Sequence, residues 1–159
     1  MNESDCYEIR QQREIIQDVC KSFDIGPPLF IECNVPQTEG TIFQAWAGLR
    51  SYLEASSSPC PFTALVMSSA QGSLGALRAL NEFGISVPSM CSVASLGAEE
   101  EHKIYVPSVT DAGMRVEAWG EGIVQVLSQR LQYPAIPPIG MRLQPQLNIR
   151  ESTAICSRK

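Results

Sequence analysis

The stretch of sequence that decides the fold is residues 62–96, which read FTALVMSSAQGSLGALRALNEFGISVPSMCSVASL. An apolar run over residues 62–67 predicts a strand, and apolar residues at helical spacing predict a helix over residues 71–83. Gly84 directly follows that helix, where glycine is the preferred C-terminal cap. A second apolar run over residues 91–96 predicts the next strand. Strand, helix and strand in this order are typical of a parallel sheet with helices packed on its faces.

The same alternation extends toward the N-terminus. Helical spacing predicts a helix over residues 7–23, which ends before Gly26, and a second helix over residues 39–54. Between these helices, the short apolar run of residues 29–33 predicts a buried strand. We therefore predict an α/β fold in which a parallel sheet is flanked by helices on both faces.

The pattern changes after the strand at residues 91–96. Residues 98–103 are polar and acidic, and we interpret His102 within them as part of a solvated surface. Residues 105–112 predict an extended crossing segment. A helix over residues 113–133 and a strand over residues 141–149 follow it.

The composition bounds the classes of protein to consider. The chain has 159 residues, of which 44% are hydrophobic and 18% are charged, and its net charge is −5. This length suits one domain with its own core. The acidic net charge argues against binding of this chain to the phosphate backbone of DNA, which needs clustered lysines and arginines. Six irregularly spaced cysteines without a C-x-x-C pair indicate buried, reduced thiols in a cytoplasmic protein. No apolar run is long enough to span a membrane, and the first five residues lack the features of a signal peptide.

Several stretches resemble the effector domain of the LacI/GalR family of bacterial transcription regulators, which respond to sugars and nucleobases. They are residues 62–66, 73–80, 84–88, 91–94, 106–110 and 148–153. The resemblance implies that residues 1–112 form the C-terminal lobe of a periplasmic-binding-protein-like fold without its first strand, including the crossing segment 105–112. It assigns residues 113–150 to a helix and a strand of the N-terminal lobe, and leaves residues 151–159 as a polar tail. The DNA-binding headpiece and most of the N-terminal lobe have no counterpart in this chain, so we expect a piece of a longer regulator.

The resemblance also points to a binding site. In the family, effector polar groups lie at the carboxyl ends of the parallel strands, in the crevice between the lobes. This places candidate effector-binding residues at Ser69, Gly97 and Met114, where family members carry acidic or amide side chains. The family's effector-binding arginine matches either Arg10 or Arg13. We predict no catalytic residue, metal ligand or cofactor.

The function that the resemblance implies is that of a sensor and not an enzyme. A small effector, such as a sugar, would bind between two lobes and control operator binding by a homodimer, which contacts DNA only through the headpiece. Two alternatives stay open. One is a degenerate sensor that serves only as a dimerisation module, and the other is a small α/β enzyme with Ser69 or Arg10 in a cleft.

The C-terminal elements carry apolar rows that the resemblance would pack within the absent lobe. Leaving them in water is costly, because a fully buried large apolar side chain contributes about 1.5–3 kcal/mol. We therefore predict that residues 113–149 fold back on the sheet or are buried against a second copy of the chain.

Overall fold

The computed structural model describes residues 7–33, 38–137 and 140–156, and the chain divides into two compact units. The first unit, residues 1–32, contains the helix α1 (Tyr7–Ser22), which confirms the predicted helix. The predicted strand over residues 29–33 is wrong, because these residues belong to no helix or strand and Leu29 is largely exposed. An apolar run favours burial, but a strand also needs a neighbouring strand to take its backbone hydrogen bonds.

The second unit, residues 33–159, is built on a four-stranded sheet. Its strands are β1 (Ala64–Met67), β2 (Ser92–Leu96), β3 (Thr110–Gly113) and β4 (Gln146–Asn148). They lie side by side in the order β1-β2-β3-β4, the first three parallel and β4 antiparallel to β3. The sheet is therefore mostly parallel, and the strands that end nearest the predicted site are consecutive neighbours.

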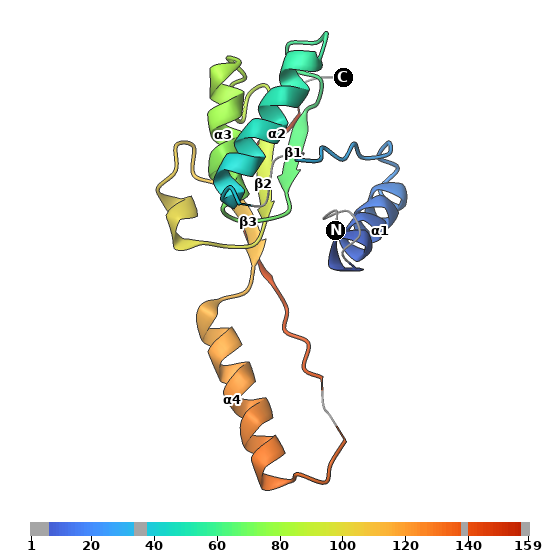
Figure 1. Cartoon of the computed structure of the whole chain (residues 1–159), viewed down its shortest axis with the longest axis vertical. Coiled ribbons are helices and arrows are strands. Elements are labelled where there is room, and N and C mark those ends of the chain that lie inside the picture. Colours follow the sequence, from blue (N-terminus) through green and yellow to red (C-terminus); the bar gives the residue numbers. More distant parts are fainter. Residues whose placement is uncertain (1–6, 34–37, 138–139, 157–159) are drawn as a thin grey trace. The chain divides into compact units, whose positions relative to one another are not determined.

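Two helices, α2 (Thr41–Ala55) and α3 (Gly72–Glu82), pack against each other beside this sheet (Figure 1). The apolar side chains that they bury include Leu49, Leu53 and Leu80. The helices come close because Gly75 has no side chain, since a Cβ there would lie 2.8 Å from the Trp46 nitrogen and closer still to the Ile42 carbonyl oxygen.

The end of α3 confirms the predicted glycine cap. Gly84 adopts the left-handed backbone conformation, with φ of 67°, which residues with a side chain rarely adopt. Its N–H donates to the Asn81 carbonyl at 3.1 Å, and the N–H of Ile85 donates to the Leu80 carbonyl at 2.9 Å. The turn that leads toward β2 is thus closed by backbone hydrogen bonds.

The acidic segment after β2 corrects one interpretation. Residues Glu100–Lys103 form a short 3₁₀ helix, labelled η2, whose charged side chains are exposed while His102 is completely buried. We interpreted His102 as part of a solvated surface, and that is wrong. One side of a helical turn faces the protein, so a polar run can bury a single residue if the core offers that residue partners.

The polar tail is tied into the sheet where it begins. The Ser152 hydroxyl accepts a hydrogen bond from the Thr110 N–H at 2.8 Å and donates one to the Val93 carbonyl at 2.6 Å. Its backbone N–H donates to the Ser108 carbonyl at 2.9 Å, and its carbonyl accepts from the Val93 N–H at 2.8 Å. Ser152 is fully buried, so its polar groups are satisfied by β2 and by the segment that leads into β3.

Replacing Ser152 with alanine should lower the free energy of unfolding by about 1–3 kcal/mol, because the buried Thr110 N–H and Val93 carbonyl lose their partner. Urea denaturation followed by circular dichroism measures the change. Ser57→Ala, in an exposed loop, is the matched control and should leave the midpoint unchanged. Equal midpoints for the two variants would contradict this prediction.

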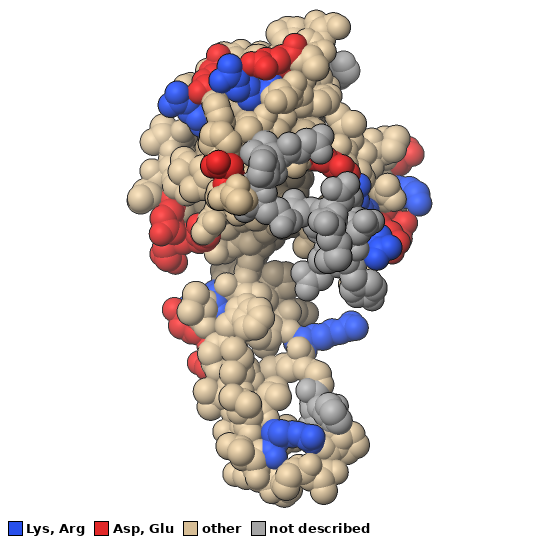
Figure 2. Space-filling model, in the orientation of Figure 1, with Lys and Arg blue, Asp and Glu red and all other residues tan. Residues whose placement is uncertain are grey.

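The C-terminal helix α4 (Val116–Gln132) leaves most of its apolar side chains in solvent. Val116 is 83% exposed, Leu131 is 82% exposed and Trp119 is 54% exposed. The surface over α4 is mostly uncharged in Figure 2. The predicted return to the sheet is observed for the strand of this range, because β4 pairs with β3. It is not observed for the helix, because residues 114 and 115 lead the chain away after β3 (Figure 1). Burial against a second copy stays a prediction.

Candidate functional site

Three of the predicted site residues follow the ends of three neighbouring strands. Ser69 comes after β1, Gly97 after β2 and Met114 after β3, and all three are partly exposed. Because these strands are parallel and adjacent, their carboxyl ends meet at one edge of the sheet. Gly97 lies against Ala70, since a Cβ at Gly97 would be 3.4 Å from the Ala70 nitrogen. The structure thus brings these positions to one edge, and their role in binding an effector stays a prediction.

Ser69 and Gly97 also have structural tasks at this edge. The Ser69 hydroxyl oxygen accepts a hydrogen bond from the Gly72 N–H at 3.2 Å, at the start of α3. Gly97 has a φ of 125°, and its N–H donates to the Ala112 carbonyl at 2.8 Å. This backbone conformation strains any residue with a side chain. An acidic residue in the place of Gly97 would therefore need a different backbone at the end of β2.

The two candidate arginines lie on α1, in the first unit. Within that unit, Arg13 forms an ion pair with Glu32 at 2.7 Å, and its guanidinium lies 5.0 Å from the centre of the Phe30 ring. Arg10 is exposed. The choice between Arg10 and Arg13 as the effector-binding arginine stays open.

A buried polar cluster beside this edge was missed by the sequence analysis. The Asp111 carboxylate lies 2.8 Å from His102 Nδ1, accepts a hydrogen bond from Asn148 Nδ2 at 2.7 Å, and pairs with the Arg150 guanidinium. His102 Nε2 lies 3.1 Å from the Ala70 carbonyl oxygen. Both His102 and Asp111 are fully buried. The signal in the sequence was Asp111, a carboxylate within an extended segment. A carboxylate needs a partner when it is buried.

The environment of Asp111 keeps its carboxylate ionised. Burial raises the pKa of Asp111. The hydrogen bonds from Asn148, Arg150 and His102 together lower it by more than burial raises it, so the pKa lies below its ordinary value. The cluster therefore joins a buried anion to the permanent cation of Arg150. It connects β3, β4, η2 and the loop after β1 in one network.

This lowered pKa predicts how acid acts on the fold. A carboxyl with a depressed folded pKa contributes stability above its unfolded pKa and loses that contribution as the pH falls through the folded pKa. For Asp111 the loss should occur below about pH 4. Urea titrations between pH 2 and 6 measure the dependence. In Asp111→Asn the slope of unfolding free energy against pH should be shallower than in the wild type, and equal slopes would contradict the prediction.

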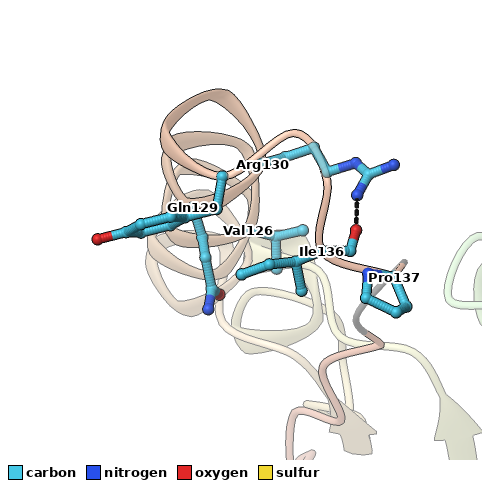
Figure 3. Close-up of a pocket in the computed structure, with 6 residues that line it drawn as sticks. Val126, Gln129, Arg130, Ile136 and Pro137 are labelled. Atoms are coloured by element: carbon cyan, nitrogen blue, oxygen red, sulfur yellow. Dashed lines mark hydrogen bonds between the residues drawn. The ribbon is translucent and has the colours of Figure 1, made fainter.

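A cavity lies away from this edge, beside the last turns of α4. Figure 3 shows its lining by Val126, Gln129, Arg130, Tyr133, Ile136 and Pro137, with the Arg130 guanidinium bonded to the Ile136 carbonyl. Its volume of about 20 Å³ has room for about one water molecule. It is too small for a sugar.

Two further features bear on the class of protein. Among residues 7–33, 38–137 and 140–156, no three His, Cys, Asp or Glu side chains gather closely enough to hold a metal ion. No helix in the same ranges has the length and apolar character that crossing a bilayer requires.

Comparison with known proteins decides the family. Residues 3–153 match the model of the periplasmic binding protein-like domain. The chain belongs to this family. Its α/β fold, with a mostly parallel sheet, agrees with that membership. A search of curated proteins finds no match.

Solved structures with this fold include several LacI-family regulators. A transcription regulator from Lactobacillus plantarum is 19% identical, with a TM-score of 0.77 over 96% of this chain and 56% of its own. A sugar-binding LacI-family regulator from Escherichia coli, complexed with phosphate, is 20% identical, with a TM-score of 0.69 over 95% of this chain and 52% of its own. A LacI-family regulator from Arthrobacter sp. FB24, in complex with lactose, is 23% identical, with a TM-score of 0.63 over 73% of this chain and 42% of its own. The chain thus spans about half the length of the structures it matches.

Proposed function

We propose that this periplasmic binding protein-like chain is the effector-sensing part of a LacI/GalR-type transcription regulator. The observation that carries the proposal is the edge formed by Ser69, Gly97 and Met114 in a chain whose family match covers residues 3–153. Structures similar to this chain hold lactose or ribose. The intact regulator would be a cytoplasmic homodimer that binds its operator through a headpiece and shifts between lobe arrangements when a sugar or related effector binds.

The polar cluster does not have the geometry of a catalytic base. A His–Asp pair at 2.8 Å could suggest a general base, but both side chains are fully buried. Asp111 is engaged by His102, Asn148 and Arg150, and the second nitrogen of His102 faces the Ala70 carbonyl. A general base has to reach the proton that it removes. The pair is therefore placed to hold segments together.

Thermal-shift measurements on the 159-residue chain test the binding proposal with lactose, ribose, polyols and purines as probes. A ligand that binds only the folded state adds about 2.7 kcal/mol of stability at a hundredfold excess over its Kd. Ser69→Trp, which would crowd the strand-end edge, should abolish the shift, while Ser57→Trp, in an exposed loop, should keep it. A shift that is unchanged in Ser69→Trp would place the binding site elsewhere.

The dimerisation module is a second candidate, which the exposed apolar side chains of α4 favour. In this alternative, α4 is covered by a second copy of the chain whether or not an effector binds. Sedimentation of the chain at tens of micromolar tests it. A monomer with Trp119 accessible to a fluorescence quencher would exclude the module.

The same proposal makes a prediction about DNA. With a net charge of −5, the chain by itself should show no measurable affinity for duplex DNA at physiological salt. A mobility-shift assay with operator-length duplexes checks this. A salt-dependent shift at submicromolar protein would contradict it.

A further inference from the structure

His102 joins the loop that carries Ser69 to the strand β3. Its Nε2 lies 3.1 Å from the carbonyl oxygen of Ala70, which directly follows Ser69, and its Nδ1 lies 2.8 Å from the Asp111 carboxylate. The same carboxylate is bonded by Asn148 of β4 and by Arg150. One buried ring therefore connects an edge position of the candidate site to both strands, β3 and β4, that flank α4 in the chain.

Both ring nitrogens of His102 face groups that only accept hydrogen bonds. The Ala70 carbonyl already accepts from the Ser73 N–H at 3.1 Å and has a second lone pair for the ring, while an ionised carboxylate has no proton to donate. The imidazolium form can donate to both partners, whereas the neutral ring can donate to only one. The neutral ring would keep the bond to the Asp111 carboxylate, because charge-assisted hydrogen bonds are the stronger ones.

We infer that His102 is a positioning residue for the strand-end edge, and that gain or loss of its proton decides whether the 68–71 loop is held against β3. With both protons, the ring fixes the Ala70 carbonyl. After losing one, it turns a lone pair toward that oxygen and the loop is released. The relevance to ligand binding rests on the proposed function, but the release itself does not.

Charged groups surround the ring on its own segment and in the buried cluster. Asp111, from β3, and Arg150 are the charged groups of the buried cluster, and both the ring and the guanidinium contact the same carboxylate oxygen. The charged neighbours of His102 on its own segment are Glu99, Glu100, Glu101 and Lys103, which are exposed or partly exposed. The Tyr105 ring meets the imidazole edge-on, with its centre 5.6 Å away. Asp111 is the only one of these charged groups with an observed bond to the ring, in the part of the chain that the structure describes.

The chain contains one histidine, which makes the test unambiguous. Nitrogen-15 NMR of the imidazole reports its protonation directly between pH 5 and 9. Amide exchange, expressed as protection factors that remove the intrinsic pH dependence, reports the loop. We expect the protection of the Gly72 and Ser73 amides to fall about tenfold together with the loss of the ring proton, the size of one lost hydrogen bond. The Phe83 amide, at the far end of α3, should be unaffected.

The variant His102→Gln tests whether the ring causes the change, because an amide side chain keeps the same number of N–H groups throughout this pH range. It should remove the pH dependence of the Gly72 and Ser73 amides, while Glu101→Gln, beside it on the exposed surface, should keep that dependence. If His102→Gln does not fold, the wild-type titration decides alone. A ring that keeps the same number of protons throughout, or one that titrates while the two amides do not respond, overturns the inference. No ligand enters this experiment, so it can fail while the proposed sensor function stands.

Discussion

Replacing Asp111 with asparagine should lower the free energy of unfolding by about 3–5 kcal/mol. The variant keeps the shape of the side chain but removes the charge and one of the two acceptor oxygens, so that Arg150 loses its anionic partner and His102 competes for the single remaining oxygen. Both contacts end at an atom with no solvent exposure, where water cannot replace the lost charge. The cost is therefore far above that of an ordinary surface ion pair.

Urea denaturation at pH 7 measures this loss. Glu100→Gln is the matched control, because Glu100 pairs with Lys103 at 2.5 Å while its side chain stays 86% exposed. That variant should unfold at the midpoint of the wild type. If Asp111→Asn were as stable as Glu100→Gln, the buried cluster would not be holding β3, β4 and η2 together.

Replacing Gly75 with alanine should lower the free energy of unfolding by about 1–3 kcal/mol or more. The new Cβ would meet the backbone of α2 at Ile42 and Trp46, and backbone atoms cannot rotate away as a flexible side chain can. The two helices would have to move apart, which would open the contact that buries Leu49 and Leu80.

Gly120→Ala tests the same substitution where space is available. Gly120 lies in α4, and nothing comes within 4 Å of a Cβ built there. The control should therefore gain about 0.5–1 kcal/mol, because alanine favours a helix more than glycine does. Thermal and urea unfolding of both variants should shift in opposite directions. A shift of the same sign for both would show that α2 and α3 do not pack as closely as the structure has them.

Local sequence patterns predicted the helices well. The helices expected over residues 39–54 and 71–83 are observed as α2 and α3 with ends shifted by one or two residues, and α4 lies within the predicted range 113–133. A helix makes its hydrogen bonds within itself, so the 3.6-residue spacing of apolar side chains is enough to find it. A strand forms only where a second strand takes its backbone hydrogen bonds, and the apolar run of residues 29–33 forms no strand in the part of the chain that the structure describes.

The candidate site was predictable only in outline. Once a parallel sheet is predicted, the positions after its strands must share an edge, and Ser69, Gly97 and Met114 follow from that rule. Nothing local indicated that Gly97 would adopt a φ of 125°, a backbone conformation that residues with a side chain rarely adopt. The polar composition of residues 151–159 likewise gave no sign that Ser152 is buried between β2 and the start of β3.

The sequence by itself thus determined the order of helices and strands, because the spacing of apolar residues acts over a few neighbouring positions. The tertiary structure alone decided the environment of His102, which lies in an acidic run that reads as a surface. Its partners are Ala70, 32 positions earlier, and Asp111, 9 positions later, and Arg150 joins them from 39 positions beyond Asp111. Burial of a charged group depends on such partners meeting in space, and only the folded chain brings them together.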